Sequence, residues 1–230
     1  MSTFRILVAD DHEVIRLGVR SMLEAVEGWK ICGEAIDGRE AVEKAKELKP
    51  DIVILDVGMP RLNGLDATYQ LLRDDPLLRI MILTINDTVQ MARAALEAGA
   101  KAYVLKTDCG RDLVAAVSAL QHGRTFFSSF TSQLVLSGYL KGIRAAKEGL
   151  GSLTSREREI VQLLAEGQRT KDVATLLNLS VKTVETHRTN MMRKLSLHSI
   201  SELVLYAVRN DIVQVHGPSS ELPELGQLVA

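Results

Sequence analysis

Residues 51–56 read Asp-Ile-Val-Ile-Leu-Asp, an unbroken run of four aliphatic side chains between two acids. A strand with one face in water alternates apolar and polar residues, whereas a strand buried on both faces does not. Residues 80–83, Ile-Met-Ile-Leu, show the same pattern. Continuous apolar runs of this length are typical of parallel strands that lie inside a sheet covered by helices on both sides.

The rest of the first 123 residues alternates short strand-like runs with longer segments of helical period. The expected strands are residues 5–9, 29–34, 51–55, 80–83 and 102–105, and the expected helices are residues 12–26, 38–48, 65–74, 88–98 and 110–122. Five β/α units of this kind predict an α/β doubly wound fold with a five-stranded parallel sheet.

The pattern changes after residue 123. Residues 124–149 contain several glycines around an apolar stretch, and we interpret them as a partly helical linker. Residues 150–215 read as a small all-α domain of four helices, the first of which opens on a capping box formed by Thr154 and Glu157. The last residues, 216–230, hold two prolines and little periodicity, and we expect them to be disordered.

Composition and charge exclude several classes of protein. The chain has 28 basic and 29 acidic side chains and 46% hydrophobic residues, so it is neither fibrous nor largely disordered. Residues 1–123 hold 15 basic and 19 acidic groups, whereas residues 151–209 hold 9 and 6, which suggests two different tasks. Two distant cysteines, no signal peptide and no membrane-spanning apolar run predict a reduced cytoplasmic protein.

Polar side chains follow the predicted strands where each strand ends: Asp10 and Asp11, Asp56, Thr84, and Lys106. Because the carboxyl ends of parallel strands meet at one edge of the sheet, these groups should converge on a single pocket. Three carboxylates so close together would repel one another unless a cation lay among them, and Mg²⁺ suits such an all-oxygen site. The alternative is that these acids merely end strands in solvated turns.

This pocket can perform phosphoryl transfer onto the protein. A carboxylate can attack phosphorus and form an aspartyl phosphate, while Lys106 supplies positive charge and Thr84 a hydroxyl donor to the phosphoryl oxygens. His12, which follows the acidic pair, is interpreted as a solvated residue at the start of a helix. Asn63-Gly64 is interpreted only as a turn signal.

The first domain resembles the receiver domain of two-component response regulators over residues 4–122. The matching text is Ile-Leu-Val-Ala-Asp-Asp-His at 6–12, Asp-Ile-Val-Ile-Leu-Asp-Val-Gly-Met-Pro at 51–60, Leu-Thr at 83–84 and Tyr-Val-Leu-Lys at 103–106. The resemblance implies that a histidine kinase phosphorylates Asp56, and that Asp10, Asp11, Asp56 and the backbone carbonyl of Gly58 hold Mg²⁺. It also implies that Thr84 and Lys106 bind the phosphoryl group and that Thr84 and Tyr103 then shift inward, which would alter the surface of the fourth helix and fifth strand.

Residues 170–195 predict a helix, a tight turn at residues 178–180 and a second helix with Ser180 as its N-cap. Val184, Met191 and Leu195 fall on one face of that second helix. The opposite face carries groups that base edges and phosphates in a major groove can use. These candidate DNA contacts are Lys182, Glu185, Thr186, Thr189 and Arg193, with Thr183 and Arg188 at the margins. For Arg188, packing of its stem against the core is an equal alternative.

The second domain resembles the LuxR-type helix-turn-helix domain over about residues 150–209. The matching stretches are Leu-Thr-Ser-Arg-Glu-Arg-Glu at 153–159, Leu-Leu-Ala-Glu-Gly at 163–167 and Leu-Ser-Val-Lys-Thr-Val-Glu-Thr-His-Arg at 179–188. In the motif Ala174 takes the small-residue position and Val184 the buried aliphatic one. Asn178 stands where many helix-turn-helix proteins have glycine in the turn, which is tolerable because Asn accepts a left-handed conformation.

The recognition face holds only two cations, Lys182 and Arg193, so one copy should bind DNA weakly and a homodimer on paired half-sites is expected. The final helix, Ile200 to Val208, and the receiver domain are the candidate dimer contacts, the first of them because family members use that helix. The implied partners are a sensor histidine kinase, a double-stranded DNA operator and, as a further candidate, RNA polymerase, with no membrane.

The two resemblances together imply a response regulator of the NarL/FixJ class that controls transcription. It would be no enzyme apart from phosphoryl transfer and autodephosphorylation at Asp56. One alternative is a magnesium-dependent phosphatase or mutase, but such enzymes carry an Asp-x-Asp pair on the nucleophile strand, whereas here the adjacent pair lies on another strand. Another is an adaptor that is never phosphorylated and whose helical domain binds protein, which DNA footprinting would distinguish.

Overall fold

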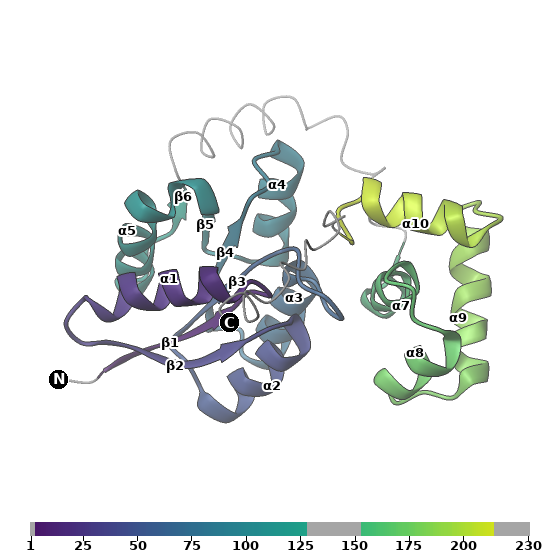
Figure 1. Ribbon diagram of the computed structural model, residues 1–230, viewed down its shortest axis with the longest axis horizontal. Helices are drawn as coiled ribbons and strands as arrows, with labels where there is room; N and C mark the ends of the chain where they lie inside the picture. Colours follow the sequence, from purple (N-terminus) through teal and green to yellow (C-terminus); the bar gives the residue numbers. More distant parts are fainter. Residues whose placement is uncertain (1–2, 128–152, 214–230) are drawn as a thin grey trace, which may run out of the picture.

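A computed structural model describes residues 3–127 and 153–213, which form two domains with separate cores (Figure 1). The predicted disordered tail and most of the predicted linker lie outside the described residues. In the first domain the strands are β1 (Phe4–Ala9), β2 (Trp29–Ala35), β3 (Ile52–Leu55), β4 (Arg79–Thr84), β5 (Ala102–Leu105) and β6 (Phe126–Phe127). They form one parallel sheet in the order β2-β1-β3-β4-β5-β6.

Helices cover both faces of this sheet. Helices α2 (Gly38–Leu48), α3 (Gly64–Asp74) and α4 (Val89–Ala98) pack on one face, and α1 (Glu13–Glu24) and α5 (Cys109–Gln121) on the other, with a short 3₁₀ turn η1 (Lys106–Asp108) before α5. Along β3, Val53 and Leu55 face the first layer, and Ile52 and Ile54 face the second. The apolar run of this strand is continuous because both of its faces are buried, which confirms the predicted fold class.

The sheet has a sixth strand that the sequence did not predict. Strand β6 falls in the segment interpreted as a linker, where Phe126 N–H donates to Lys101 O at 3.0 Å and the two phenylalanines pack on opposite faces of the sheet. A strand of two residues is too short to show a period of two, so no pattern distinguishes it from a loop.

The second domain consists of α7 (Ser155–Ala165), α8 (Thr170–Leu176), α9 (Val181–Lys194) and α10 (Ile200–Arg209) around one apolar core. The predicted capping box is confirmed: Glu157 N–H donates to Thr154 Oγ1 at 3.2 Å, and Thr154 N–H donates to Glu157 Oε2 at 2.7 Å. Ser180 caps α9 by accepting from Thr183 N–H, and Asn178 takes the expected left-handed conformation at φ 51°. Among the helices of the described residues, none combines the length and the apolar character that crossing a bilayer requires.

Candidate functional site

The side chains that end the central strands of the sheet meet at one edge of it. Lys106 Nζ lies 2.7 Å from Asp10 Oδ2 and 3.1 Å from Asp56 Oδ2, so the end of β5 is joined to the ends of β1 and β3. Oxygens of Asp10, Asp11 and Asp56 lie within 4.8 Å of one another. Asp10 and Asp56 are buried, and the Lys106 side chain is only 9% exposed. The predicted pocket is therefore present as a compact group of three acids and one base.

The electrostatics of the pocket favour a bound cation. Burial raises the pKa of Asp56; attraction to Lys106 opposes this shift, and repulsion from Asp10 and Asp11 adds to it. Burial acts against the charge of Lys106, but attraction to Asp56 and Asp10 outweighs burial and raises its pKa. One ammonium group thus pairs with two of the three carboxyl groups, and the donor set is made of carboxylate oxygens. These residues fit Mg²⁺, which prefers oxygen ligands and few protein contacts.

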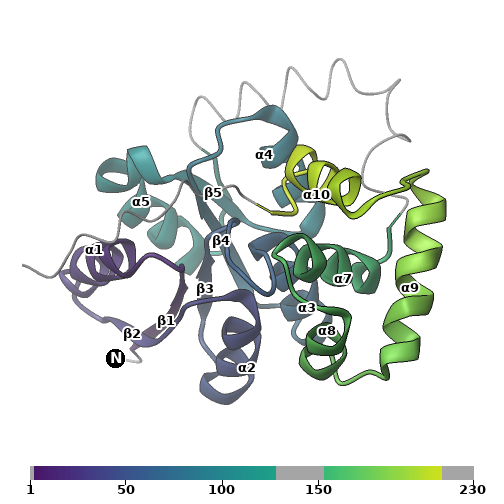
Figure 2. The same cartoon turned by 45° about the vertical axis from the view of Figure 1, so that its right-hand side comes forward.

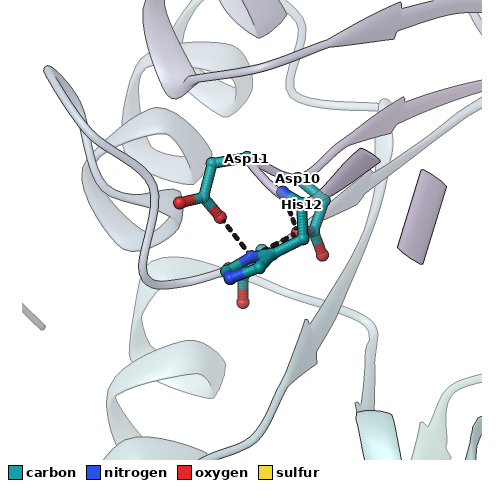
Figure 3. Close-up of side chains that lie close together, drawn as sticks. Asp10, Asp11 and His12 are labelled. Carbon is teal, nitrogen blue, oxygen red and sulfur yellow. Dashed lines mark hydrogen bonds and ion pairs between the residues drawn. The ribbon is translucent and has the colours of Figure 1, made fainter. Parts of the chain in front are cut away.

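His12 is exposed at the start of α1, as interpreted from the sequence, but it also contacts the acidic pair. It is the N-terminal residue before α1, and its ring faces the acidic pair (Figure 3), with Nδ1 at 2.7 Å from Asp11 Oδ1 and 3.2 Å from Asp10 Oδ1. Its side chain is half exposed. His12 N–H also donates to Asp10 Oδ1 at 2.9 Å, so both the backbone and the ring of His12 contact the acidic pair. The adjacency of His12 to Asp10 and Asp11 in the sequence was the only signal that could have predicted this contact.

The two residues implied to move on activation are connected through a third that the sequence analysis missed. Thr84 is fully buried at the end of β4, and its Oγ1 accepts from Asn86 N–H at 3.2 Å. Tyr103 is 1% exposed, and its hydroxyl donates to the carbonyl of Asn86. Burial, with the nearby charges of Asp87 and Asp211, raises the pKa of Tyr103. Tyr103 therefore already lies inward and neutral, and it holds the segment that follows Thr84.

The second candidate site is the exposed face of α9. Val184 and Met191 are buried in the helical core, as predicted. The five residues predicted for the opposite face are exposed, namely Lys182, Glu185, Thr186, Thr189 and Arg193, while Thr183 and Arg188 are half-buried. Helix α9 lies on the side of its domain away from the receiver-like domain (Figure 1), so no described part of that domain covers this face. The structure therefore presents a polar helix to the outside.

Comparison with known proteins assigns both domains. Residues 6–118 match the response regulator receiver domain, and residues 151–207 match the luxR family of bacterial regulatory proteins. The chain is 33% identical over 212 residues to the response regulator protein VraR of Staphylococcus aureus. The aligned region covers 92% of this chain and 100% of VraR. The chain therefore belongs to the two-component response regulators that combine a receiver domain with a LuxR-type helix-turn-helix domain. It is a DNA-binding regulator of transcription controlled by phosphorylation.

Solved structures agree with this family. RcsB from Salmonella enterica serovar Typhimurium, bound to a promoter in the presence of the phosphomimetic BeF₃⁻, is 27% identical, with a TM-score of 0.59 and coverage of 92% of this chain and 100% of that chain. A LuxR-family response regulator from Aurantimonas sp. SI85-9A1 is 35% identical, with a TM-score of 0.58 and coverage of 60% and 99%. Both the receiver fold and the helical domain are thus those of response regulators.

Proposed function

We propose that Asp56 is the phosphoacceptor of this response regulator. Asp56 Oδ would attack the phosphorus of a phosphohistidine on a sensor kinase; the P–N bond would break, and the departing imidazole would take up a proton. Lys106 would then turn from the Asp56 carboxylate to the phosphoryl oxygens, and the Thr84 hydroxyl would donate to another of them. The observation that supports this assignment is the contact of Lys106 with both Asp10 and Asp56 at the carboxyl end of β3.

Asp10, Asp11, Asp56 and the backbone carbonyl of Gly58 are the proposed ligands of Mg²⁺. When bound, the ion would supply positive charge that offsets the developing negative charge on the phosphoryl oxygens. Asp10 and Asp11 would bind it from the end of β1, while His12 would orient the Asp11 carboxylate through the contact of its Nδ1 with Asp11 Oδ1 at 2.7 Å.

Activation is proposed to act through Thr84 and Asn86. Because Tyr103 already lies inward, the movement that phosphorylation requires is assigned to Thr84 and the segment after it, with Tyr103 as the fixed partner of Asn86. The resulting change around α4 would allow two copies to pair through the receiver domain or through α10, and two α9 helices would then read paired DNA half-sites. The protein would act in the cytoplasm, where its DNA target lies, and would contact RNA polymerase at the promoter.

Intact mass after incubation with acetyl phosphate and Mg²⁺ tests the phosphoacceptor. Wild type should gain one labile phosphate, and Asp56→Asn should gain none. Asp75→Asn, which changes an exposed aspartate at the end of α3, is the matched control and should behave as wild type. A binding assay on selected DNA should then show tighter binding by the phosphorylated form. Equal phosphate on Asp56→Asn and wild type would overturn the assignment.

A further inference from the structure

The backbone of Asp10 is held from two neighbouring elements at the point where β1 ends. Asp10 N–H donates to Ala35 O in β2 at 3.1 Å, and Asp10 O accepts from Arg16 Nη1 in α1 at 2.8 Å. Figure 2 shows α1 alongside β1 and β2. Because the peptide bond is planar, a hydrogen bond to the Asp10 carbonyl also sets the plane in which the Asp11 nitrogen lies. Arg16 therefore acts on the peptide unit that joins the two proposed metal ligands after β1.

Arg16 is itself held by Glu34, near the end of β2. Arg16 Nε lies 3.1 Å from Glu34 Oε2, and the Arg16 side chain is only 12% exposed. A guanidinium is planar, and its N–H donors point in fixed directions. When Nε binds the carboxylate, the direction of Nη1 is restricted as well, so Glu34 directs the second donor toward the Asp10 carbonyl.

The direction of Glu34 depends on a β-bulge in β2. The register against β1 moves from Ile31 directly to Gly33 and skips Cys32. Cys32 packs in the layer of α2, α3 and α4, and a Cβ on Gly33 would meet Leu48 in that layer at 2.5 Å. Two consecutive residues thus lie on one face, and Glu34 lies on the opposite face, where α1 packs. In a regular strand Glu34 would share the face of Cys32 and could not reach α1.

The charge of Arg16 would by itself disfavour a metal ion at this site. A cation beside Asp10 and Asp11 would be repelled by a nearby guanidinium. Glu34 carries the opposite charge and lies at hydrogen-bonding distance from Arg16, so it offsets this repulsion. What Arg16 then contributes is direction, because it places a donor of fixed geometry on the Asp10 carbonyl.

We propose that Arg16 is a positioning residue of the metal site, which fixes the peptide between Asp10 and Asp11 so that both carboxylates are directed at Mg²⁺ before the ion binds, and that Glu34 acts through Arg16. The inference rests on the proposed roles of Asp10 and Asp11 as ligands. Without Arg16 the peptide has more than one accessible orientation, and binding of the ion has to order it. Residues that hold metal ligands in this way typically change metal affinity by about 10- to 100-fold.

Isothermal titration calorimetry of the full chain with MgCl₂ tests the proposal without any phosphoryl donor. Arg16→Gln should bind Mg²⁺ at least about tenfold more weakly than wild type. Arg20→Gln is the matched control, because Arg20 Nε also donates to Glu34, at 2.7 Å, but its other contact is with Glu24 and not with Asp10. Each variant removes one positive charge from the same carboxylate, which by charge alone favours the cation. Arg20→Gln should therefore bind Mg²⁺ at least as tightly as wild type, and a loss in Arg16→Gln alone reports the lost positioning.

A second variant, Arg16→Lys, separates direction from charge. It keeps the positive charge, but one ammonium on a flexible stem lacks the rigid fork that joins Glu34 to Asp10. It should also bind Mg²⁺ more weakly than wild type, and it keeps the test decisive if Arg16→Gln fails to fold. Urea unfolding followed by Trp29 fluorescence is measured in parallel. A purely structural role for Arg16 would lower the urea midpoint and leave the affinity for Mg²⁺ unchanged.

A double-mutant cycle tests the role of Glu34. Glu34→Gln should weaken Mg²⁺ binding in the wild-type chain and change it much less in the Arg16→Gln chain, because its effect passes through Arg16. Additive effects of the two substitutions would remove Glu34 from the proposal.

Phosphorylation by acetyl phosphate gives an independent readout. Arg16→Gln should raise the Mg²⁺ concentration at half-maximal rate and leave the rate at saturating Mg²⁺ near that of wild type. The proposal is overturned if wild type binds Mg²⁺ and both Arg16 variants bind it equally well, or if Arg20→Gln loses as much affinity as Arg16→Gln. If wild type itself binds no Mg²⁺, it is the assignment of Asp10 and Asp11 as ligands that fails, so the two failures are distinguishable.

Discussion

Replacement of Gly64 by alanine tests the geometry that places Asp56. Gly64 is the first residue of α3, and a Cβ added there would lie 2.1 Å from the backbone oxygen of Asp56 and 3.1 Å from Val57 Cα. These neighbours are backbone atoms of the strand end, which cannot rotate away as a side chain could. Gly64 N–H also donates to Val57 O at 3.0 Å, so any displacement weakens this bond.

The expected cost follows from three contributions. Overpacking of a closed site costs about 1–3 kcal/mol, and the weakened hydrogen bond costs about 1 kcal/mol. The better helix propensity of alanine returns at most about 1 kcal/mol. The net loss in free energy of unfolding should therefore be about 2 kcal/mol, which lowers the urea midpoint by about 1 M at a typical slope of about 2 kcal/mol per M.

Fluorescence of Trp29 provides the assay, because it is the only tryptophan of the chain and lies buried in β2 of the receiver domain. Gly18→Ala is the control: Gly18 lies inside α1, and no heavy atom stands within 4 Å of its added Cβ. This control should raise stability by about 0.5–1 kcal/mol. An unchanged midpoint for Gly64→Ala, or an equal loss in both variants, would refute the close approach of α3 to Asp56.

Three further results are expected. Burial would raise the pKa of Glu34, but the hydrogen bonds and charges of Arg20 and Arg16 outweigh burial and lower it. Glu34 therefore contributes stability that is fully present above its unfolded pKa of about 4.3. This contribution is lost as the pH falls through the folded pKa. Glu34→Gln should thus destabilise the protein by up to about 1 kcal/mol at pH 7, and the difference from wild type in urea unfolding should shrink below pH 4. Arg193→Ala should reduce the slope of log affinity for DNA against log salt by about 0.9 per subunit, measured by fluorescence anisotropy; an unchanged slope would remove Arg193 from the phosphate contacts. Chelation by EDTA should abolish phosphate uptake from acetyl phosphate and leave Trp29 fluorescence unchanged, whereas continued uptake would contradict the metal site.

The acidic pocket around Asp56 could be predicted because it depends on strand order and on residues that directly follow strands. Asp56 and Lys106 meet wherever β3 and β5 are parallel and end at the same edge of the sheet, and apolar runs are enough to place those strands. The helical domain was predictable for a similar local reason, since Thr154 and Ser180 are caps whose hydrogen bonds involve only near neighbours.

Contacts between distant segments could not be predicted in this way. In the sequence Asn86 resembles an ordinary loop residue, and only the structure shows that it contacts Tyr103 and Asp211. On α7, Arg158 and Gln162 have the spacing of a solvated helix face, and only the receiver domain beside them shows that the face is buried. Asn63 was interpreted as part of a turn, although it caps α3 and also binds Gln162. In each case the partner lies 17 or more residues away in the chain.

Helix α7 has to satisfy two folds with eleven residues. Its apolar side, which includes Ile160 and Leu163, completes the core of the helical domain, while Arg158 and Gln162 complete the surface of the receiver. A chimera that joins this helical domain to a foreign receiver would keep the first set of contacts and bury the second against unmatched groups. Receiver and helical domains are therefore exchangeable only when residues 59–66 and α7 come from the same protein. Homologous chains should accordingly show paired substitutions between these two segments.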